Sequence, residues 1–212
     1  MTKLQSDKTK NLFLYGESSI GKSTLLFQSL GEADVMPYAL GYRTARIINS
    51  EDEIIGYAQS DVQSDQEDFH FNQLSDQHLD NQFMILQSGQ VIKFDFEVFQ
   101  VFTIPILKKA LQQFKTGQIT FFMVMDEIGG MELLNVEIKQ VYIEVLNSDM
   151  PCIGITKAPF VIEKTKSNKD FLAVLLDSDK TELLNADELS KAEMRECIQE
   201  WLTKNKIGEK IG

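Results

Sequence analysis

Short apolar runs that alternate with amphipathic stretches organise this chain and predict an α/β fold. The run N-L-F-L-Y at 11–15 stops at a glycine, which is typical of a buried parallel strand. Beyond the turn that follows, Leu25, Leu26 and Leu30 fall at helical spacing, and Gly31 supplies a stop. The beginning of the chain is therefore predicted to form a strand, a loop and a helix.

The second half of the chain continues this alternation. Further apolar runs predict buried strands at 118–125, 151–156 and 171–176. Apolar residues at helical spacing predict helices at 104–114, 131–146 and 187–204. Because parallel strands need long crossover connections, strands separated by helices favour a largely parallel sheet with helices on both faces.

The segment between the first helix and residue 96 has a different pattern. Two strands joined by a polar turn are expected within 39–60, and two more within 83–96, as antiparallel hairpins at one edge of the sheet. The segment 61–80 between them holds six acidic residues and no Lys or Arg, so it is interpreted as a surface loop. His70 and His78 lie in this loop among acids, where a solvated loop is favoured over a metal site.

Length and composition predict one globular domain, 1–212, in which 39–96 is the β-hairpin elaboration. The formal charge of -11 argues against a large nucleic-acid footprint, because binding a phosphate backbone needs a basic surface. Cys152 and Cys197 have neither metal-site nor disulfide spacing, which favours free thiols in a reducing cytoplasm. No signal peptide or membrane span is recognised, so a cytoplasmic protein is expected, and no protein partner is indicated.

The most specific motif is G-E-S-S-I-G-K-S at 16–23, the phosphate-binding loop pattern G-x-x-x-x-G-K-S. It lies between the first predicted strand and helix, where backbone N–H groups and the helix dipole favour an anion. Lys22 is expected to bridge the β- and γ-phosphates as a catalytic residue, and the Ser23 hydroxyl to ligate Mg²⁺. The predicted nucleotide-binding residues are Gly16, Glu17, Ser18, Ser19, Ile20, Gly21, Lys22, Ser23 and Thr24.

An acidic pair, Asp126-Glu127, follows the strongest buried-strand signal in the chain. In phosphate-loop enzymes a second acidic element supports the magnesium, so Asp126 is predicted as a metal residue together with Ser23. Glu127, one residue further, is predicted to accept a proton from an attacking water molecule. The pair favours hydrolysis over passive nucleotide binding.

The run V-M-D-E-I-G-G-M-E-L-L at 124–134 resembles the D-E-I-G-x-M-E-L signature of a small family of P-loop nucleoside-triphosphatases, known from thermophilic prokaryotes and from human. Other similar segments occur in the same order, and the resemblance spans roughly residues 11–160. It implies a RecA-like core that hydrolyses ATP, GTP and other nucleoside triphosphates with Mg²⁺. Asp126 and Glu127 then correspond to metal and water residues. Glu132 also corresponds to a motif position, with no role assigned beyond that of an acid at a helix N-terminus.

The chain departs from the family near its end, where a late strand is usually followed by an Asn-Arg pair. Residues 176–189 contain no arginine, and the whole chain has only Arg43, Arg46 and Arg195. If an arginine normally stabilises charge on the transferred phosphate, turnover is expected to be slow, with Lys180 or a partner's lysine as a substitute.

Two other function classes stay open, a nucleoside or nucleotide kinase and a nucleotide-binding switch with little turnover. The kinase is disfavoured because such enzymes hold the migrating phosphoryl group with several arginines. A guanine-specific GTPase switch is rejected, because Pro159 in T-K-A-P occupies the position of the base-reading aspartate.

Overall fold

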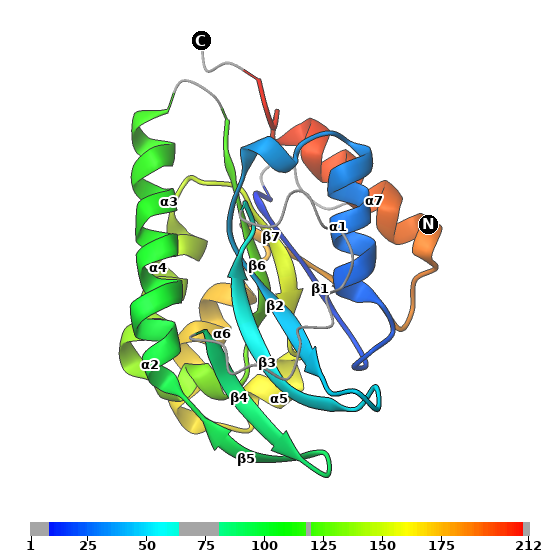
Figure 1. Ribbon diagram of the computed structural model, residues 1–212. Coiled ribbons are helices and arrows are strands. Elements are labelled where there is room, and N and C mark those ends of the chain that lie inside the picture. The colour runs from blue at the N-terminus through cyan, green and yellow to red at the C-terminus, as the bar shows by residue number, and fades with distance from the viewer. Residues whose placement is uncertain (1–8, 64–80, 118–119, 210–212) are drawn as a thin grey trace.

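The computed structural model describes residues 9–63, 81–117 and 120–209. These residues form an eight-stranded sheet in the order β5-β4-β3-β2-β6-β7-β1-β8 (Figure 1). The strands are β1 (Asn11–Tyr15), β2 (Ala39–Ile48), β3 (Ile54–Asp61), β4 (Gln82–Gln87), β5 (Gln90–Phe94), β6 (Phe122–Ile128), β7 (Cys152–Thr156) and β8 (Thr181–Asn185). Most of the predicted loop 61–80, with His70 and His78, lies outside the described residues.

The sheet has a parallel part and an antiparallel edge, which confirms the predicted fold class. Strands β2, β6, β7, β1 and β8 run parallel to their neighbours, whereas β2 to β5 pair as successive antiparallel neighbours. Strand β2 belongs to both parts, since Ala39–Tyr42 pair with β6 and Tyr42–Ile48 pair with β3. The carboxyl ends of the parallel strands therefore lie beside the hairpins at 39–60 and 82–94.

Helices cover both faces of the parallel part (Figure 1). The α-helices are α1 (Lys22–Glu32), α2 (Phe96–Val98), α3 (Ile104–Thr116), α4 (Val136–Asn147), α5 (Pro159–Glu163), α6 (Lys169–Leu175) and α7 (Lys191–Lys204). Short 3₁₀ segments lie at η1 (Met36–Tyr38), η3 (Met131–Leu134) and η4 (Lys166–Asn168), and η2 (Phe99–Thr103) is a π-helical turn that leads into α3.

The two faces of the sheet carry separate hydrophobic clusters. Along β1, Leu12 and Leu14 point to the side of α1 and α7, while Phe13 points to the side of α3, α4 and α6. This alternation follows from the two-residue period of a strand, and burial on both faces explains why β1 is apolar throughout. The strand that precedes the glycine-rich loop is thus anchored on both sides.

One strand prediction was wrong, and one strand was not predicted. The run F-L-A-V-L-L at 171–176 forms helix α6, because Phe171, Leu172 and Leu175 are buried on one side while Leu176 is 48% exposed. The late strand is instead β8, whose T-E-L-L-N sequence is too short and polar to stand out. As an edge strand paired only with β1, β8 needs no continuous apolar run.

Several boundaries also differ from the predictions. The helix predicted at 131–146 begins at Val136, after the 3₁₀ segment η3. Strand β6 begins at Phe122 rather than at 118, and it continues through Asp126 and Glu127 to Ile128. The predicted helix 187–204 begins at Lys191, where Ser190 and Glu193 form a capping box.

Candidate active site

The loop Gly16–Gly21 connects β1 to α1 as predicted, and its backbone is shaped for close approach of a ligand. Gly16 and Gly21 have φ of 145° and 92°, and Ser19 has φ of 68°. A Cβ at Gly21 would meet no atom within 4 Å, so its left-handed backbone conformation, rather than crowding, accounts for glycine there. A Cβ at Gly16 would lie 2.8 Å from the Asp187 carboxylate.

The Asp187 carboxylate also binds the backbone at the start of the loop. Asp187, in the turn between β8 and α7, accepts hydrogen bonds from the Glu17 N–H at 3.0 and 3.1 Å. The Lys22 side chain folds back onto the start of the loop, where its ammonium donates to the carbonyls of Gly16 at 3.1 Å and Glu17 at 2.5 Å. Burial lowers the pKa of Lys22, while the nearby Glu127 carboxylate opposes that shift. The ammonium is thus already positioned within the loop.

Ser23 and Asp126, predicted to share a metal site, are in direct contact. The Ser23 hydroxyl donates to Asp126 Oδ1 at 3.0 Å, which joins the start of α1 to the end of β6. Asp126 is 2% exposed. Burial and the neighbouring Glu127 raise the pKa of Asp126 from 3.8 to about 7, against the Ser23 hydrogen bond and the charges of Arg43 and Lys22.

Glu127 lies next to Asp126 and lines the pocket, where its side chain meets a lysine. Its carboxylate forms an ion pair with the ammonium of Lys157, from the loop after β7. Strand β2 holds its backbone, because the Glu127 N–H donates to Thr44 Oγ1 at 3.3 Å and the Tyr42 hydroxyl lies 3.4 Å from the Glu127 carbonyl oxygen. The carboxylate is thus half-exposed on a fixed backbone.

Glu132 is a buried group rather than a solvated acid at a helix end. Its Oε1 accepts hydrogen bonds from the N–H groups of Gly129 at 2.7 Å and Gly130 at 2.9 Å. Burial raises the pKa of Glu132, and these two backbone donors oppose the shift. The side chain therefore holds the chain in a tight turn directly after Asp126 and Glu127.

A pocket of about 640 Å³ brings these residues together. Lys22, Ser23, Asp126, Glu127 and Glu132 all line it, as do Ser18, Ser19, Gly21 and Thr24. Of the predicted nucleotide-binding residues, Gly16, Glu17 and Ile20 do not line the pocket.

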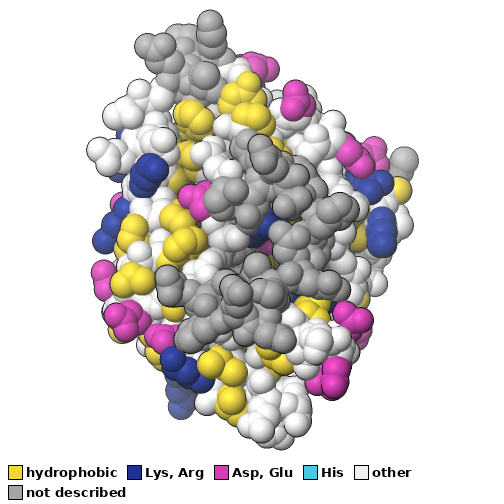
Figure 2. Space-filling view, in the orientation of Figure 1, with side chains coloured by type: hydrophobic (Ala, Val, Ile, Leu, Met, Phe, Trp, Pro, Cys, Tyr) yellow, Lys and Arg dark blue, Asp and Glu magenta, His cyan; other side chains and the backbone are white. Residues whose placement is uncertain are grey.

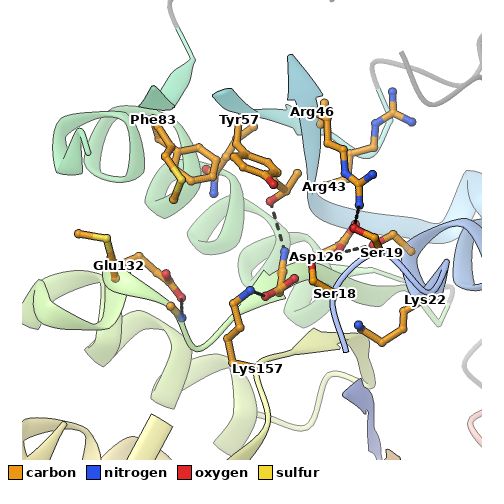
Figure 3. Close-up of a pocket in the computed structure, with 18 of the residues that line it drawn as sticks. Ser18, Ser19, Lys22, Arg43, Arg46, Tyr57, Phe83, Asp126, Glu132 and Lys157 are labelled. Atoms are coloured by element: carbon orange, nitrogen blue, oxygen red, sulfur yellow. Dashed lines mark hydrogen bonds and ion pairs between the residues drawn. The ribbon is translucent and has the colours of Figure 1, made fainter. Parts of the chain in front are cut away.

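Sequence reasoning missed three basic residues that line this pocket, Arg43 and Arg46 of β2 and Lys157. Arg46 donates to Ser19 Oγ at 3.1 Å, so β2 contacts the loop Gly16–Gly21 directly (Figure 3). Lys157 was considered only as part of T-K-A-P, and the two arginines only for their number in the chain, because the fold alone brings all three residues to the loop. Two of the chain's three arginines therefore lie in the pocket, which weakens the argument against a kinase from arginine scarcity.

Lys180 does not substitute for the missing late arginine, contrary to expectation. Its ammonium donates to Asn147 Oδ1 at 2.9 Å and pairs with Asp177 at 3.6 Å. Its carbonyl accepts the N–H of Asn11, so it lies at the amino end of β1, opposite the phosphate-binding loop. Pro159, the residue on which a GTPase was rejected, begins helix α5.

A comparison with known families identifies the chain. A family model described as NTPase matches residues 11–189. The chain belongs to the NTPase family. It is therefore a hydrolase acting on nucleoside triphosphates, and the family that the D-E-I-G-x-M-E-L resemblance implied is confirmed.

Two solved structures support the fold of this NTPase. The crystal structure of THEP1 from the hyperthermophile Aquifex aeolicus has a TM-score of 0.58 and 17% identity, covering 91% of this chain and 97% of that one. The solution structure of a human cancer-related nucleoside triphosphatase has a TM-score of 0.60 and 17% identity, covering 92% of this chain and 96% of that one. A search among curated proteins finds no match.

The oxygen atoms of this NTPase site fit magnesium. Mg²⁺ prefers oxygen ligands and is usually held by one or two protein groups plus phosphates and water. Ser23 Oγ and the buried Asp126 carboxylate supply such a pair beside Lys22. Among the described residues no cluster of three or more His, Cys, Asp or Glu is arranged to hold a metal.

Within the described part of the chain, no helix has the length and apolar character needed to cross a membrane. On the face shown in Figure 2, basic side chains occur among acidic ones rather than in one basic field.

Proposed function

We propose that the protein hydrolyses nucleoside 5′-triphosphates, ATP and GTP among them, to the diphosphate and phosphate in an Mg²⁺-dependent reaction. The observation that carries the proposal is the convergence of Lys22, Ser23, Asp126 and Glu127 in one pocket at the carboxyl ends of β1 and β6. We also propose that the protein works in the cytoplasm. Cys152 and Cys197 are both free thiols, as is usual in a reducing compartment.

In this mechanism the loop residues 16–24 bind the phosphates through their N–H groups. Lys22 exchanges its two carbonyl partners for β- and γ-phosphate oxygens. Its positive charge then lowers the free energy of the transition state, in which the transferred group is negatively charged. Ser23 and Asp126 would hold Mg²⁺, which neutralises the phosphate charge when bound. Arg43 and Arg46 lie near enough to the loop to add positive charge in place of the missing late arginine.

Glu127 acts as the base for the attacking water. Its fixed backbone directs the carboxylate into the pocket, and its pairing with Lys157 orients it there. Because the bound triphosphate is itself an anion, its γ-phosphate can share the Lys157 ammonium with the Glu127 carboxylate in the same pocket. The water oxygen forms a bond to the γ-phosphorus and its proton passes to the Glu127 carboxylate. The bond from that phosphorus to the β-phosphate oxygen breaks, and the nucleoside diphosphate leaves.

The test measures phosphate release from ATP, GTP, CTP and UTP, with Mg²⁺ and with EDTA. Lys22→Ala is expected to lower kcat/KM through weaker phosphate binding, and Glu127→Gln to lower kcat by about 10²- to 10⁴-fold with nucleotide binding retained. Glu144→Gln removes the same charge from an exposed position on α4 and should have no effect. Release that persists in EDTA or in Glu127→Gln would contradict the proposed mechanism.

A further inference from the structure

The pocket continues beyond the residues that a triphosphate and a water molecule need. Its far end is an apolar lobe, defined by Tyr57, Phe83, Leu86, Val91, Phe94 and Phe99. Figure 3 shows Tyr57 and Phe83 on one side of Asp126 and Lys157, with Ser18, Ser19 and Lys22 on the other. The basic groups of the pocket and Asp126 thus lie on the phosphate-loop side of the lobe or at its border, while the buried Glu132 lies on the Phe83 side.

The order of the strands places this lobe on the side from which a nucleophile attacks. The phosphate-binding loop follows β1, Glu127 lies at the end of β6, and the lobe is built from β3, β4, β5 and η2. In phosphoryl transfer the attacking and leaving oxygens are roughly in line on opposite sides of the phosphorus. With the β-phosphate in the loop and the γ-phosphate beside Lys22 and Glu127, the attacking oxygen comes from the direction of the lobe.

The lobe is suited to a flat, uncharged ring. The Phe83 ring packs edge-on against Phe94 and Phe99 at centroid distances of 5.7 and 5.0 Å, and it lies 6.4 Å from the Tyr57 ring with the two planes tilted by 31°. Such aromatic surfaces bind heteroaromatic rings by stacking, without reading a particular base. The basic residues that line the pocket, Lys22, Arg43, Arg46 and Lys157, do not belong to the lobe, so a charged phosphate would have no partner there.

We propose that the apolar lobe binds a nucleoside, or a similar neutral aromatic alcohol, as a phosphoryl acceptor; this rests on the proposed binding of a triphosphate in the loop. The acceptor hydroxyl oxygen forms a bond to the γ-phosphorus while the bond from that phosphorus to the β-phosphate oxygen breaks. The hydroxyl proton passes to the Glu127 carboxylate. The products are a nucleoside diphosphate and a nucleoside monophosphate, and hydrolysis is the same reaction with water in the acceptor's place.

The test uses adenosine, guanosine, cytidine, uridine and thymidine as probes. Calorimetry measures their binding to the protein with Mg²⁺ and a non-hydrolysable ATP analogue. Chromatography measures the products formed from ATP with each nucleoside. We expect at least one nucleoside to bind and to be phosphorylated, so that free phosphate no longer accounts for all the ADP formed.

Two substitutions on strand β5 locate the acceptor. Val91 is 48% exposed and lines the lobe, so Val91→Glu should fold and should weaken nucleoside binding by about tenfold or more. Ile92, 59% exposed, is the next residue on the same strand and does not line the pocket, so Ile92→Glu is the matched control and should bind like the wild type. Figure 2 shows hydrophobic side chains exposed over this hairpin, at the lower edge of the molecule.

The outcomes separate this inference from the proposed hydrolysis. Binding of no probe, or equal binding by Val91→Glu and the wild type, would overturn the acceptor site, and binding without a monophosphate product would overturn its role in transfer. Phosphate release in the absence of nucleosides, lost in Lys22→Ala, reports hydrolysis independently. Phosphate release can therefore be observed without nucleoside binding, and nucleoside phosphorylation can be observed without phosphate release.

Discussion

At the residue scale, the site contains a carboxyl group that costs stability. Asp126 is 2% exposed, and one hydrogen bond from Ser23 compensates only part of its desolvation. The folded chain therefore binds a proton at Asp126 more tightly than the unfolded chain does, because the pKa is raised from 3.8 to about 7. As the pH rises through this interval the free energy of unfolding falls, since the folded state holds more protons.

This sign leads to a prediction for Asp126→Asn without nucleotide or Mg²⁺. The amide has no charge to desolvate and its oxygen can still accept from Ser23, so the variant should be more stable by about 2 kcal/mol at pH 8. At pH 3, below both pKa values, Asp126 is protonated in the folded and the unfolded chain, and the difference should disappear. Urea unfolding followed by circular dichroism at both pH values measures it, with the exposed Asp179→Asn as control. A gain that is equal at both pH values would contradict this account.

The predictability of the site residues depends on whether they share a local pattern. The motif around Lys22 and Ser23 and the acidic end of β6 were recognisable because each has a fixed spacing on a strand end. Their direct contact through Ser23 and Asp126 accords with the predicted metal pair, whose role stays a prediction. Arg43, Arg46 and Lys157 carry no such spacing, since each reaches the pocket only because β2 and β7 flank β6.

At the element scale, the turn after β6 is held by one side chain. Glu132, in η3, accepts the N–H groups of Gly129 and Gly130, and a Cβ at Gly129 would lie 2.8 Å from Ile162 on α5. The turn is therefore confined between η3 and α5, which orients the end of β6. We infer that Glu132 is a positioning residue for Glu127.

Exchanging Glu132 tests this position. Glu132→Ala removes the acceptor of two buried N–H groups and should lower kcat by about tenfold with KM changed less than about twofold. Glu132→Gln keeps an acceptor oxygen and should restore most of the activity. Steady-state kinetics on both variants measures the division between kcat and KM. A larger change in KM than in kcat, or equal losses in the two variants, would contradict a positioning role.

The predictability of elements depended on their surroundings. Strands buried on both faces, such as β1 and β7, have continuous apolar runs and were located from the sequence. Helix α6 has an equally apolar sequence but packs one face on α4, and length alone did not distinguish it from a strand. Strand β8 was missed for the opposite reason, because its position at the sheet edge permits polar residues.

At the scale of the whole molecule, helix α7 packs against strand β6, which carries Asp126 and Glu127. Trp201 of α7 packs edge-on against Phe122 of β6 at 5.9 Å, and its indole N–H donates to the carbonyl of Lys10 at 2.9 Å. One side chain thus links α7, β6 and the residue before β1. The sequence predicted this helix and its apolar stripe. It did not predict that Trp201 would pack on Phe122, because that contact depends on the order of the strands, which no local pattern contains.

Trp201→Ala should lower the free energy of unfolding by about 3–5 kcal/mol, because it opens a large cavity and removes one of the two N–H donors to the Lys10 carbonyl, which keeps the Cys152 N–H. Urea unfolding measured by far-UV circular dichroism gives the change, since the variant lacks the chain's one tryptophan. Phe160→Ala, at a position 65% exposed on α5, is the control and should cost less than about 1 kcal/mol. A loss at Trp201 no greater than that at Phe160 would show that α7 does not stabilise the sheet.

The pairing of β1 also has a consequence for how the protein is made. Both neighbours of β1, β7 and β8, come from the last third of the chain, and α7 packs against α1. During synthesis the glycine-rich loop therefore leaves the ribosome long before the strands that support it. Since strand pairing between distant segments forms late and slowly, the nascent chain acquires nucleotide affinity only after β8 has been translated. Ribosomes that stop before that strand would release chains that carry the complete loop motif and bind no triphosphate.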